Sequence, residues 1–130
     1  MDLSVLFLGT AASAPTARRG LPASLVRRGG DRILIDCGEG TQRQMLRSGA
    51  GLVDVEEILL THCHADHFLG LPGLLKTFGL RGRETPLRLY GPAGLGALLA
   101  TMHPVIGRLP FPLERNELRP GDELPHDGYR

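Results

Sequence analysis

The sequence has few of the residues that build disulfide frameworks, aromatic surfaces or membrane spans. Its 130 residues include two cysteines, no tryptophan and 5% aromatic residues. Cys37 and Cys63 form neither a C-x-x-C pair nor a secreted disulfide pattern, so we expect reduced thiols in a reducing compartment. No stretch approaches the roughly 20 apolar residues of a membrane helix, and the first four residues lack the basic region of a secretory signal. These absences predict a cytoplasmic protein without a membrane partner.

The chain also lacks a charge excess. Fifteen lysine and arginine residues stand against fourteen acidic ones, which gives a net charge of +1 and excludes nucleic-acid binding through bulk charge. A nucleic-acid partner would therefore need a local site. Only Lys76 is a lysine and the other fourteen cations are arginines, whose planar forks suit phosphate oxygens. The alternative explanation for the preference for arginine over lysine is a biased codon usage, since the chain is rich in Ala, Gly, Arg and Pro.

Length and composition favour one folded domain with a hydrophobic core, since 42% of the residues are hydrophobic and 22% are charged. Apolar runs between Gly and Pro residues predict strands over 3–8, 23–28, 32–36, 55–61, 87–90 and 109–118. The remaining patterns predict helices over 39–48, 68–78 (interrupted at Pro72-Gly73) and 95–102. We expect strand 3–8 to be buried, 11–22 to be a loop, and 119–130 to contain no closing apolar element. Strands that alternate with helices indicate an α/β fold.

The densest chemistry lies directly after the predicted strand 55–61, where residues 61–67 read T-H-C-H-A-D-H. On an extended segment, His62 and His64 project to one side and Cys63 to the other. This places two imidazoles on one metal ion and leaves the thiol out. Asp66 and His67 then follow at the start of the next helix and supply half of a second metal shell, with Zn²⁺ the best match to these ligand types.

Two neighbouring metal ions are suited to hydrolysis, because at about 3.5–4 Å apart they share and activate one water. Asp66, next to that water, is the expected proton acceptor. The alternative is a purely structural zinc site or unconnected surface histidines. Structural sites usually use several cysteines in a closed tetrahedron, and the single nearby cysteine is out of phase.

The H-x-H-x-D-H pattern at residues 62–67 resembles the signature of the metallo-β-lactamase fold, a four-layer αββα sandwich with a dinuclear metal site. Five further segments are similar, in order and spacing, to the ribonuclease Z family: F-L-G-T at 7–10, P-T-x-x-R at 15–19, D-C-G-E-G-T-Q at 36–42, G-L-P-G-L-L at 70–75 and L-Y-G-P-x-G-L at 89–95. Members of that family trim the 3′ trailer from precursor tRNA. The resemblance extends from residue 3 to about residue 122.

The resemblance implies a role for each matching residue. His62 and His64 would bind one zinc ion and Asp66 and His67 the other, with Asp66 also the catalytic proton acceptor. Asp36 would support the metal loop from behind the ligands, or alternatively cap a helix. Four residues would lie near the tRNA 3′ end, although for the arginines a plain solvated loop is the alternative: Arg18, Arg19, Glu39 and Thr41.

The chain departs from the family in length. Family members are about twice as long and complete the site with a further His, a bridging Asp and another His. Of the spare histidines, His103 matches no family ligand, and His126 lies where the family's chain approaches its next ligand strand. We therefore expect residues 1–130 to form a single partial domain, truncated relative to the family, that supplies the first half of the sandwich.

Three functions follow from this reading. The first is a zinc-dependent tRNA 3′-processing endoribonuclease, which the isolated chain represents only in part. The second is a non-catalytic fragment or interaction module with an incomplete metal site. The third is another hydrolase of the same fold, against which the G-L-P-G and D-C-G-E segments argue. The resemblance implies precursor tRNA and a homodimer as partners, and an uncovered sheet face predicts self-association.

Overall fold

A computed structural model describes residues 2–52 and 54–130 and contains a six-stranded mixed sheet. The strands lie side by side in sequence order: β1 (Leu3–Gly9), β2 (Ala23–Arg28), β3 (Asp31–Ile35), β4 (Glu57–Leu59), β5 (Leu87–Gly91) and β6 (Leu113–Glu117). The first three strands are antiparallel, and β3 to β6 run parallel to one another. A two-residue turn joins β2 to β3, with Gly29 at φ 56°, a backbone conformation that glycine adopts without steric cost.

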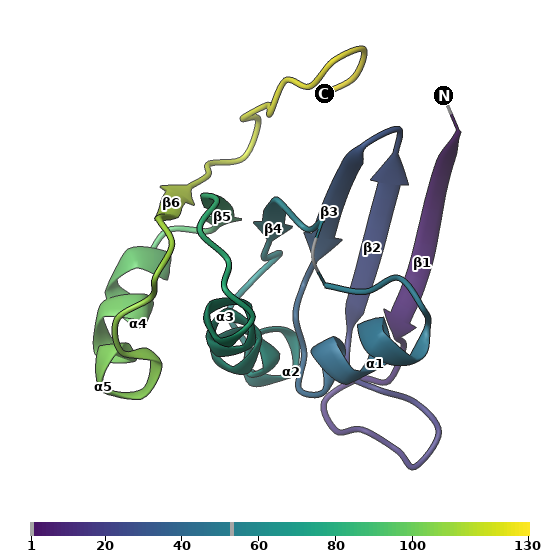
Figure 1. Cartoon of the computed structure of the whole chain (residues 1–130), viewed down its shortest axis with the longest axis horizontal. Coiled ribbons are helices and arrows are strands. Elements are labelled where there is room, and N and C mark those ends of the chain that lie inside the picture. The colour runs from purple at the N-terminus through teal and green to yellow at the C-terminus, as the bar shows by residue number, and fades with distance from the viewer. Residues whose placement is uncertain (1, 53) are drawn as a thin grey trace.

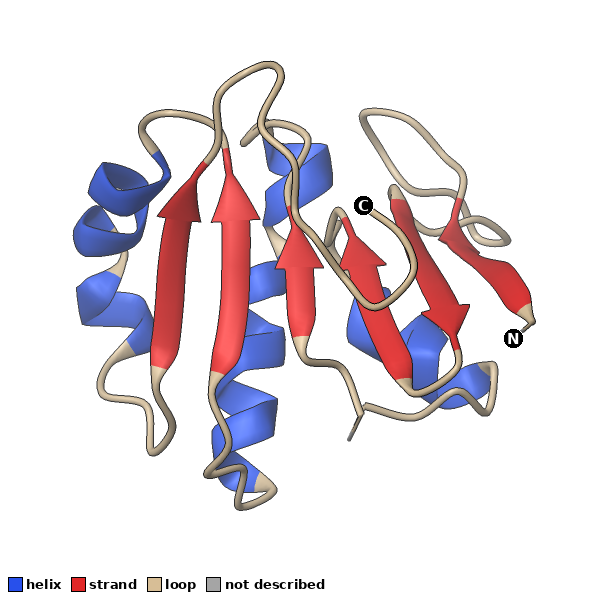
Figure 2. Ribbon diagram, turned by 90° about the horizontal axis from the view of Figure 1, so that it is seen from above, coloured by secondary structure: helices blue, strands red, loops and turns tan. Residues whose placement is uncertain are grey.

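The helices all cover one face of the sheet (Figure 1 and Figure 2). They are α1 (Thr41–Arg47), α2 (Ala65–Phe68), α3 (Gly70–Leu80), α4 (Leu95–Thr101) and α5 (His103–Ile106). The core lies between these helices and the sheet, where alternate strand residues such as Leu34, Ile58 and Leu89 are fully buried. Leu71 and Leu74 of α3 are buried in this core. Among the described residues, no helix combines the length and apolar content needed to cross a bilayer.

The opposite face of the sheet is covered only in part. The segment 124–130 crosses it (Figure 2), and the Arg28 guanidinium donates a hydrogen bond to the Asp127 carbonyl. His126 Nε2 lies 2.7 Å from Glu57 Oε1, and the Tyr129 hydroxyl donates to Asp31 at 2.9 Å. We expected no closing apolar element in this part of the chain. The segment contains an isolated His126–Tyr129 bridge and is joined to the sheet by polar contacts.

The predicted elements are present, with differences at β1, at β4, in the helix predicted over 68–78, after the helix predicted over 95–102, where the unpredicted α5 contains Pro104, and at the strand predicted over 109–118, of which only 113–117 form β6. The strand 3–8 is buried on one side only: Leu8 is 4% exposed in the core, whereas Leu3, Val5 and Phe7 of this edge strand, β1, face away from the helices and are 67%, 49% and 70% exposed. The expected strand 55–61 is regular only over residues 57–59.

The third difference concerns the helix predicted over 68–78. The interruption lies before Gly70, between α2 and α3, and not at Pro72-Gly73. Pro72 lies in the first turn of α3, where a missing backbone N–H costs no intrahelical hydrogen bond. The α/β prediction is confirmed, and one sheet with a helical layer on one face corresponds to the first half of an αββα sandwich.

Candidate metal centre

The candidate site lies at the carboxyl ends of β3 and β4. These two strands are parallel neighbours, so the residues that follow them, Asp36 and Thr61, meet at the same edge of the sheet. The backbone N–H of Asp36 donates to the Leu59 carbonyl at 2.8 Å and extends the pairing by one step. The T-H-C-H segment therefore leaves the sheet directly beside Asp36.

Asp36 holds this part of the site together. Its φ of 60° lies in the left-handed region, which costs most L-residues about 1–2 kcal/mol and which Asp and Asn tolerate best. The residue is only 6% exposed. Its carboxylate accepts hydrogen bonds from the Thr61 amide at 2.8 Å and the Thr61 hydroxyl at 2.9 Å, and it lies 2.8 Å from His67 Nδ1. Helix α1 has no side-chain cap, so Asp36 supports the histidine segment and does not cap a helix.

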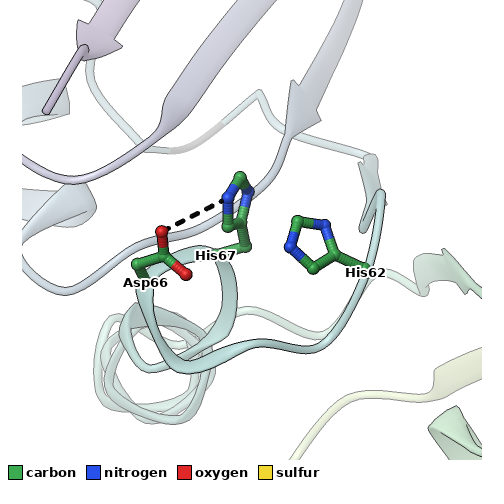
Figure 3. A group of neighbouring side chains, drawn as sticks. All are labelled: His62, Asp66 and His67. Carbon is green, nitrogen blue, oxygen red and sulfur yellow. Dashed lines mark ion pairs between the residues drawn. The ribbon is translucent and has the colours of Figure 1, made fainter. Parts of the chain in front are cut away.

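Three potential ligands converge next to Asp36. His62, Asp66 and His67 each offer an atom within 4.8 Å of the others (Figure 3). The rings of His62 and His67 have centroids 4.1 Å apart, and His67 Nε2 lies 3.5 Å from Asp66 Oδ2. His64 is exposed and lies outside this group, although its ring centroid is 4.7 Å from that of His62. The fold thus brings together three of the four predicted ligands and places the fourth at their edge.

Asp66 is connected to the loop that follows β1. The backbone N–H of Ser13 donates to Asp66 Oδ2 at 3.1 Å, and Ser13 itself has a left-handed φ of 64°. This hydrogen bond, helped by the nearby His67, outweighs partial desolvation and lowers the pKa of the Asp66 carboxyl below its usual value. Asp66 is therefore ionised at neutral pH, as a metal ligand or a proton acceptor must be.

Two glycines allow the close packing that positions α2. The Cys37 N–H donates to the His67 carbonyl at 2.9 Å, and the Gly70 N–H donates to the Cys37 carbonyl at 3.0 Å. A Cβ on Gly70 would collide with the Gly38 carbonyl oxygen, and a Cβ on Gly38 would collide with the Asp66 carbonyl oxygen. The D-C-G and G-L-P-G segments are thus packed backbone to backbone around the candidate ligands.

Neither cysteine belongs to the ligand group. Cys63 packs against the hydrophobic core, and burial together with the Asp36 charge raises the pKa of its thiol. Cys37 is completely buried, and burial raises its pKa to about 12. Neither sulfur is among the three ligand atoms that converge next to Asp36.

Three of the four predicted substrate residues, Arg18, Arg19 and Glu39, lie around a depression of about 400 Å³ between the loop after β1 and helix α1. Arg18 and Arg19 line it from the loop, and Arg43 and Arg47 line it from successive turns of α1. All four are exposed, and within residues 2–52 and 54–130 none of their guanidinium groups forms an ion pair. Glu39 is the one acidic residue among the described residues of this lining.

Thr41 and the two spare histidines are placed elsewhere. Thr41 is 2% exposed and its hydroxyl donates to the Gly38 carbonyl at 2.7 Å, so the structure assigns it to the start of α1 and not to substrate contact. His103 is exposed at the start of α5. His126 contacts Glu57 on the open face of the sheet and lies outside the ligand group.

Sequence reasoning assigned no role to four residues of this region. Thr61 was visible as the residue directly before His62, and Arg43 and Arg47 were visible as an i, i+4 pair of arginines in a short predicted helix. Ser13 gave no signal, because its contribution is a backbone N–H in an irregular loop.

The family model of the metallo-beta-lactamase superfamily matches residues 19–129. The chain belongs to the metallo-beta-lactamase superfamily. Metal ions are implied by this membership, and two imidazoles and an ionised carboxylate converging at a partly exposed site fit a divalent cation.

The chain is similar to ribonuclease Z. It is 45% identical to "Ribonuclease Z" of Myxococcus xanthus over 128 residues, covering 98% of this chain and 41% of the relative. It is 47% identical to "Ribonuclease Z" of Bradyrhizobium diazoefficiens over 129 residues, covering 97% and 43%. The chain therefore spans about two fifths of the length of these curated relatives.

Solved structures agree with this superfamily membership. The short form of human tRNase Z superposes with a TM-score of 0.80 at 43% identity, over 89% of this chain and 44% of that one. The metallo-beta-lactamase fold protein YhfI from Bacillus subtilis superposes with a TM-score of 0.78 at 18% identity, over 95% of this chain and 48% of that one. At that identity the second match shows the fold alone.

Proposed function

We propose that this chain carries the metal-binding part of a zinc-dependent endoribonuclease that removes the 3′ trailer from precursor tRNA. The observation that carries the proposal is the convergence of His62, Asp66 and His67 within 4.8 Å, beside a buried carboxylate, in a chain 45% identical to a ribonuclease Z. Imidazole and carboxylate ligands without thiolate suit zinc in a catalytic site, where a coordination position stays open for water or substrate.

Four residues would hold the metal in the proposed site: His62 and His64 one zinc ion, and Asp66 and His67 the other. A pair of such ions supplies an activated water and neutralises phosphate charge during in-line displacement. Asp66 has a lowered pKa, and the Ser13 amide holds the same carboxylate oxygen, Oδ2, that lies 3.5 Å from His67 Nε2. Asp66 is accordingly the proposed proton acceptor.

The arginine-lined depression supports an RNA partner. It shares a loop with Ser13, whose amide contacts Asp66, so a phosphate bound by Arg18 or Arg19 would be tied through one short loop to the metal centre. Arginine binds phosphate oxygens with two parallel hydrogen bonds. With a net charge of +1, the chain would bind RNA through this local cluster, next to the 3′ end that is cleaved, with Glu39 at its rim.

This chain would be one part of a larger enzyme. Residues 1–130 would form one partial metallo-beta-lactamase domain, and the complete enzyme would add the remaining ligands. Leu3, Val5 and Phe7 form an exposed apolar surface on the outer side of β1. This surface supports self-association of the chain or formation of a homodimer. The expected compartment is the cytoplasm.

The test combines metal content with cleavage. The purified chain is dialysed against zinc, its metal content is measured, and a labelled precursor tRNA is added. We expect bound zinc and RNA binding, with cleavage next to the 3′ trailer once the remaining ligands are supplied, and we expect Asp66→Asn to reduce zinc binding and cleavage strongly while RNA binding through the arginines persists. Asp54→Asn is the matched control, because Asp54 is exposed and its side chain has no hydrogen bond or ion pair among the described residues. A chain that binds neither zinc nor RNA would contradict the proposal.

A second candidate is a metal-binding module without catalysis of its own. The number of ligands favours it: three ligand atoms converge in this chain, and a site for two metal ions needs more than three. The same assay separates the two candidates: zinc binding that depends on Asp66, without cleavage, supports the module.

A further inference from the structure

Thr61 connects the buried Asp36 carboxylate to His62. The Thr61 amide donates to Asp36 Oδ1 at 2.8 Å, and the Thr61 hydroxyl oxygen lies 3.0 and 2.9 Å from the two carboxylate oxygens. The same hydroxyl oxygen lies 2.9 Å from His62 Nδ1. Through Thr61, His62 is thus linked to the carboxylate that His67 contacts directly.

The short contacts along this chain favour one assignment of its protons. A carboxylate accepts hydrogen bonds and donates none, and a hydroxyl has a single proton to donate. The Thr61 proton therefore goes to Asp36, and its oxygen accepts a hydrogen bond from the Nδ1–H of His62. The His62 proton is then on Nδ1, and Nε2 keeps its lone pair. His67 obeys the same rule, because its Nδ1 lies 2.8 Å from Asp36 Oδ2.

We propose that Thr61 is a positioning residue through which the single carboxylate of Asp36 sets both His62 and His67 in the Nδ1–H tautomer, with both Nε2 atoms free for metal. The inference rests on the proposed metal centre and deepens it. A hydrogen bond to one ring nitrogen determines which nitrogen is left as the ligand. In this assignment both histidines offer Nε2 to a metal before any ion binds.

A purely structural role for Thr61 would not need its hydroxyl. The two oxygens of Asp36 already accept hydrogen bonds from the Thr61 amide and His67, and Thr61 itself is exposed. What the hydroxyl adds is the contact to His62. His64 provides a comparison inside the same segment, since no side-chain hydrogen bond to its ring is found in the part of the chain that the structure describes.

The test measures the histidine tautomers directly, by long-range ¹H–¹⁵N correlation spectra of the ¹⁵N-labelled chain without zinc. We expect Nδ1–H for His62 and His67 in the wild type. In Thr61→Val, which keeps the amide and the side-chain shape, His62 loses its preference for Nδ1–H while His67 keeps it. Thr61→Ser restores the hydroxyl and the Nδ1–H form of His62. His64 is the internal control and stays the same in all three proteins.

Zinc affinity is the second measurement. Loss of a residue that orients a ligand lowers metal affinity by about 10–100-fold, so we expect a fall in that range for Thr61→Val and near-wild-type affinity for Thr61→Ser. Far-UV circular dichroism checks that both variants fold.

The inference is overturned if wild-type His62 carries its proton on Nε2, or if Thr61→Val leaves the His62 tautomer and the zinc affinity unchanged. A wild-type chain with the expected tautomers that binds no zinc overturns the proposed metal centre but supports the hydrogen-bonded chain from Asp36 to His62.

Discussion

Glu57 is the most informative residue to perturb for stability. It is 4% exposed on the open face of the sheet, and its carboxylate contacts His126 Nε2 at 2.7 Å and Arg88 at 3.3 Å. Glu57→Gln keeps the size of the side chain and removes its charge. Because both contacts join the strand β4 to other parts of the chain, the variant measures how strongly the segment 124–130 is held on the sheet.

The expected cost follows from the exposure of the two partners. The His126 side chain is 14% exposed, and a hydrogen bond between such groups with one charge contributes about 1.5–3 kcal/mol. The Arg88 side chain is 37% exposed, so its ion pair is screened by solvent and contributes about 0–1 kcal/mol. Glu57→Gln should therefore lower the free energy of unfolding by about 1.5–4 kcal/mol at acidic pH, a large part of the 5–15 kcal/mol typical of a domain.

The cost should depend on pH. Burial lowers the pKa of His126, but the hydrogen bonds to Glu57 and to the Leu124 carbonyl outweigh burial, and the pKa is raised above its ordinary value of 6.5. A raised folded-state pKa gives stability that is fully present below the unfolded-state pKa and is lost as the pH rises through the folded-state pKa. The penalty of Glu57→Gln should accordingly be largest below about pH 6.5 and shrink as the pH rises through the raised pKa.

Urea unfolding of wild type and variant across this pH range is the assay. Glu56→Gln is the matched control: its neighbouring carboxylate is 67% exposed and lies 3.6 Å from Arg88, so it should cost less than about 1 kcal/mol at any pH. A double-mutant cycle with His126→Gln isolates the pair. A Glu57→Gln penalty equal to that of Glu56→Gln, or one that does not change with pH, would refute this account.

Three further outcomes are expected. Gly70→Ala should destabilise the chain by about 1–3 kcal/mol and weaken zinc binding, because the new Cβ collides with the Gly38 carbonyl oxygen; urea unfolding and zinc titration check this, and an unchanged midpoint would contradict it. Phe7→Ser, at a position 70% exposed on the edge strand, should reduce self-association in light scattering, and a monomeric wild type would remove its basis. Arg43→Ala should weaken RNA binding and lower the slope of log affinity against log salt by about 1, whereas the exposed Arg108→Ala should leave both unchanged.

The local part of the site was predictable because it is encoded in consecutive residues. An apolar strand followed by H-C-H-A-D-H and a helix start fixes where His62, Asp66 and His67 emerge, and the structure brings their ligand atoms within 4.8 Å. The hairpin between β2 and β3 follows in the same way from its glycines. In both cases the spacing of neighbouring residues determines the geometry.

Contacts between segments far apart in the chain could not be predicted from sequence patterns. Glu57 lies in a run that reads as an apolar strand, and its partner His126 is 69 residues away. The exposure of β1 depends on what covers the sheet face and not on the composition of the strand, in which Ser4 is the one polar side chain. The basic depression requires the loop after β1 to lie beside α1, an arrangement that no periodicity encodes.

At Asp36, the sequence pattern predicted part of the result and contacts between distant segments determined the rest. Its D-C-G-E segment was recognisable, but the choice between a helix cap and a supporting carboxylate depended on its φ of 60°, which turns the carboxylate toward Thr61 and His67. The end of β3, the end of β4 and the start of α2 are thereby joined at one buried charge. Because this one side chain contacts residues at all three places, the same packing that joins these elements also holds the histidines, and a metal ion would meet ligands already positioned by the fold.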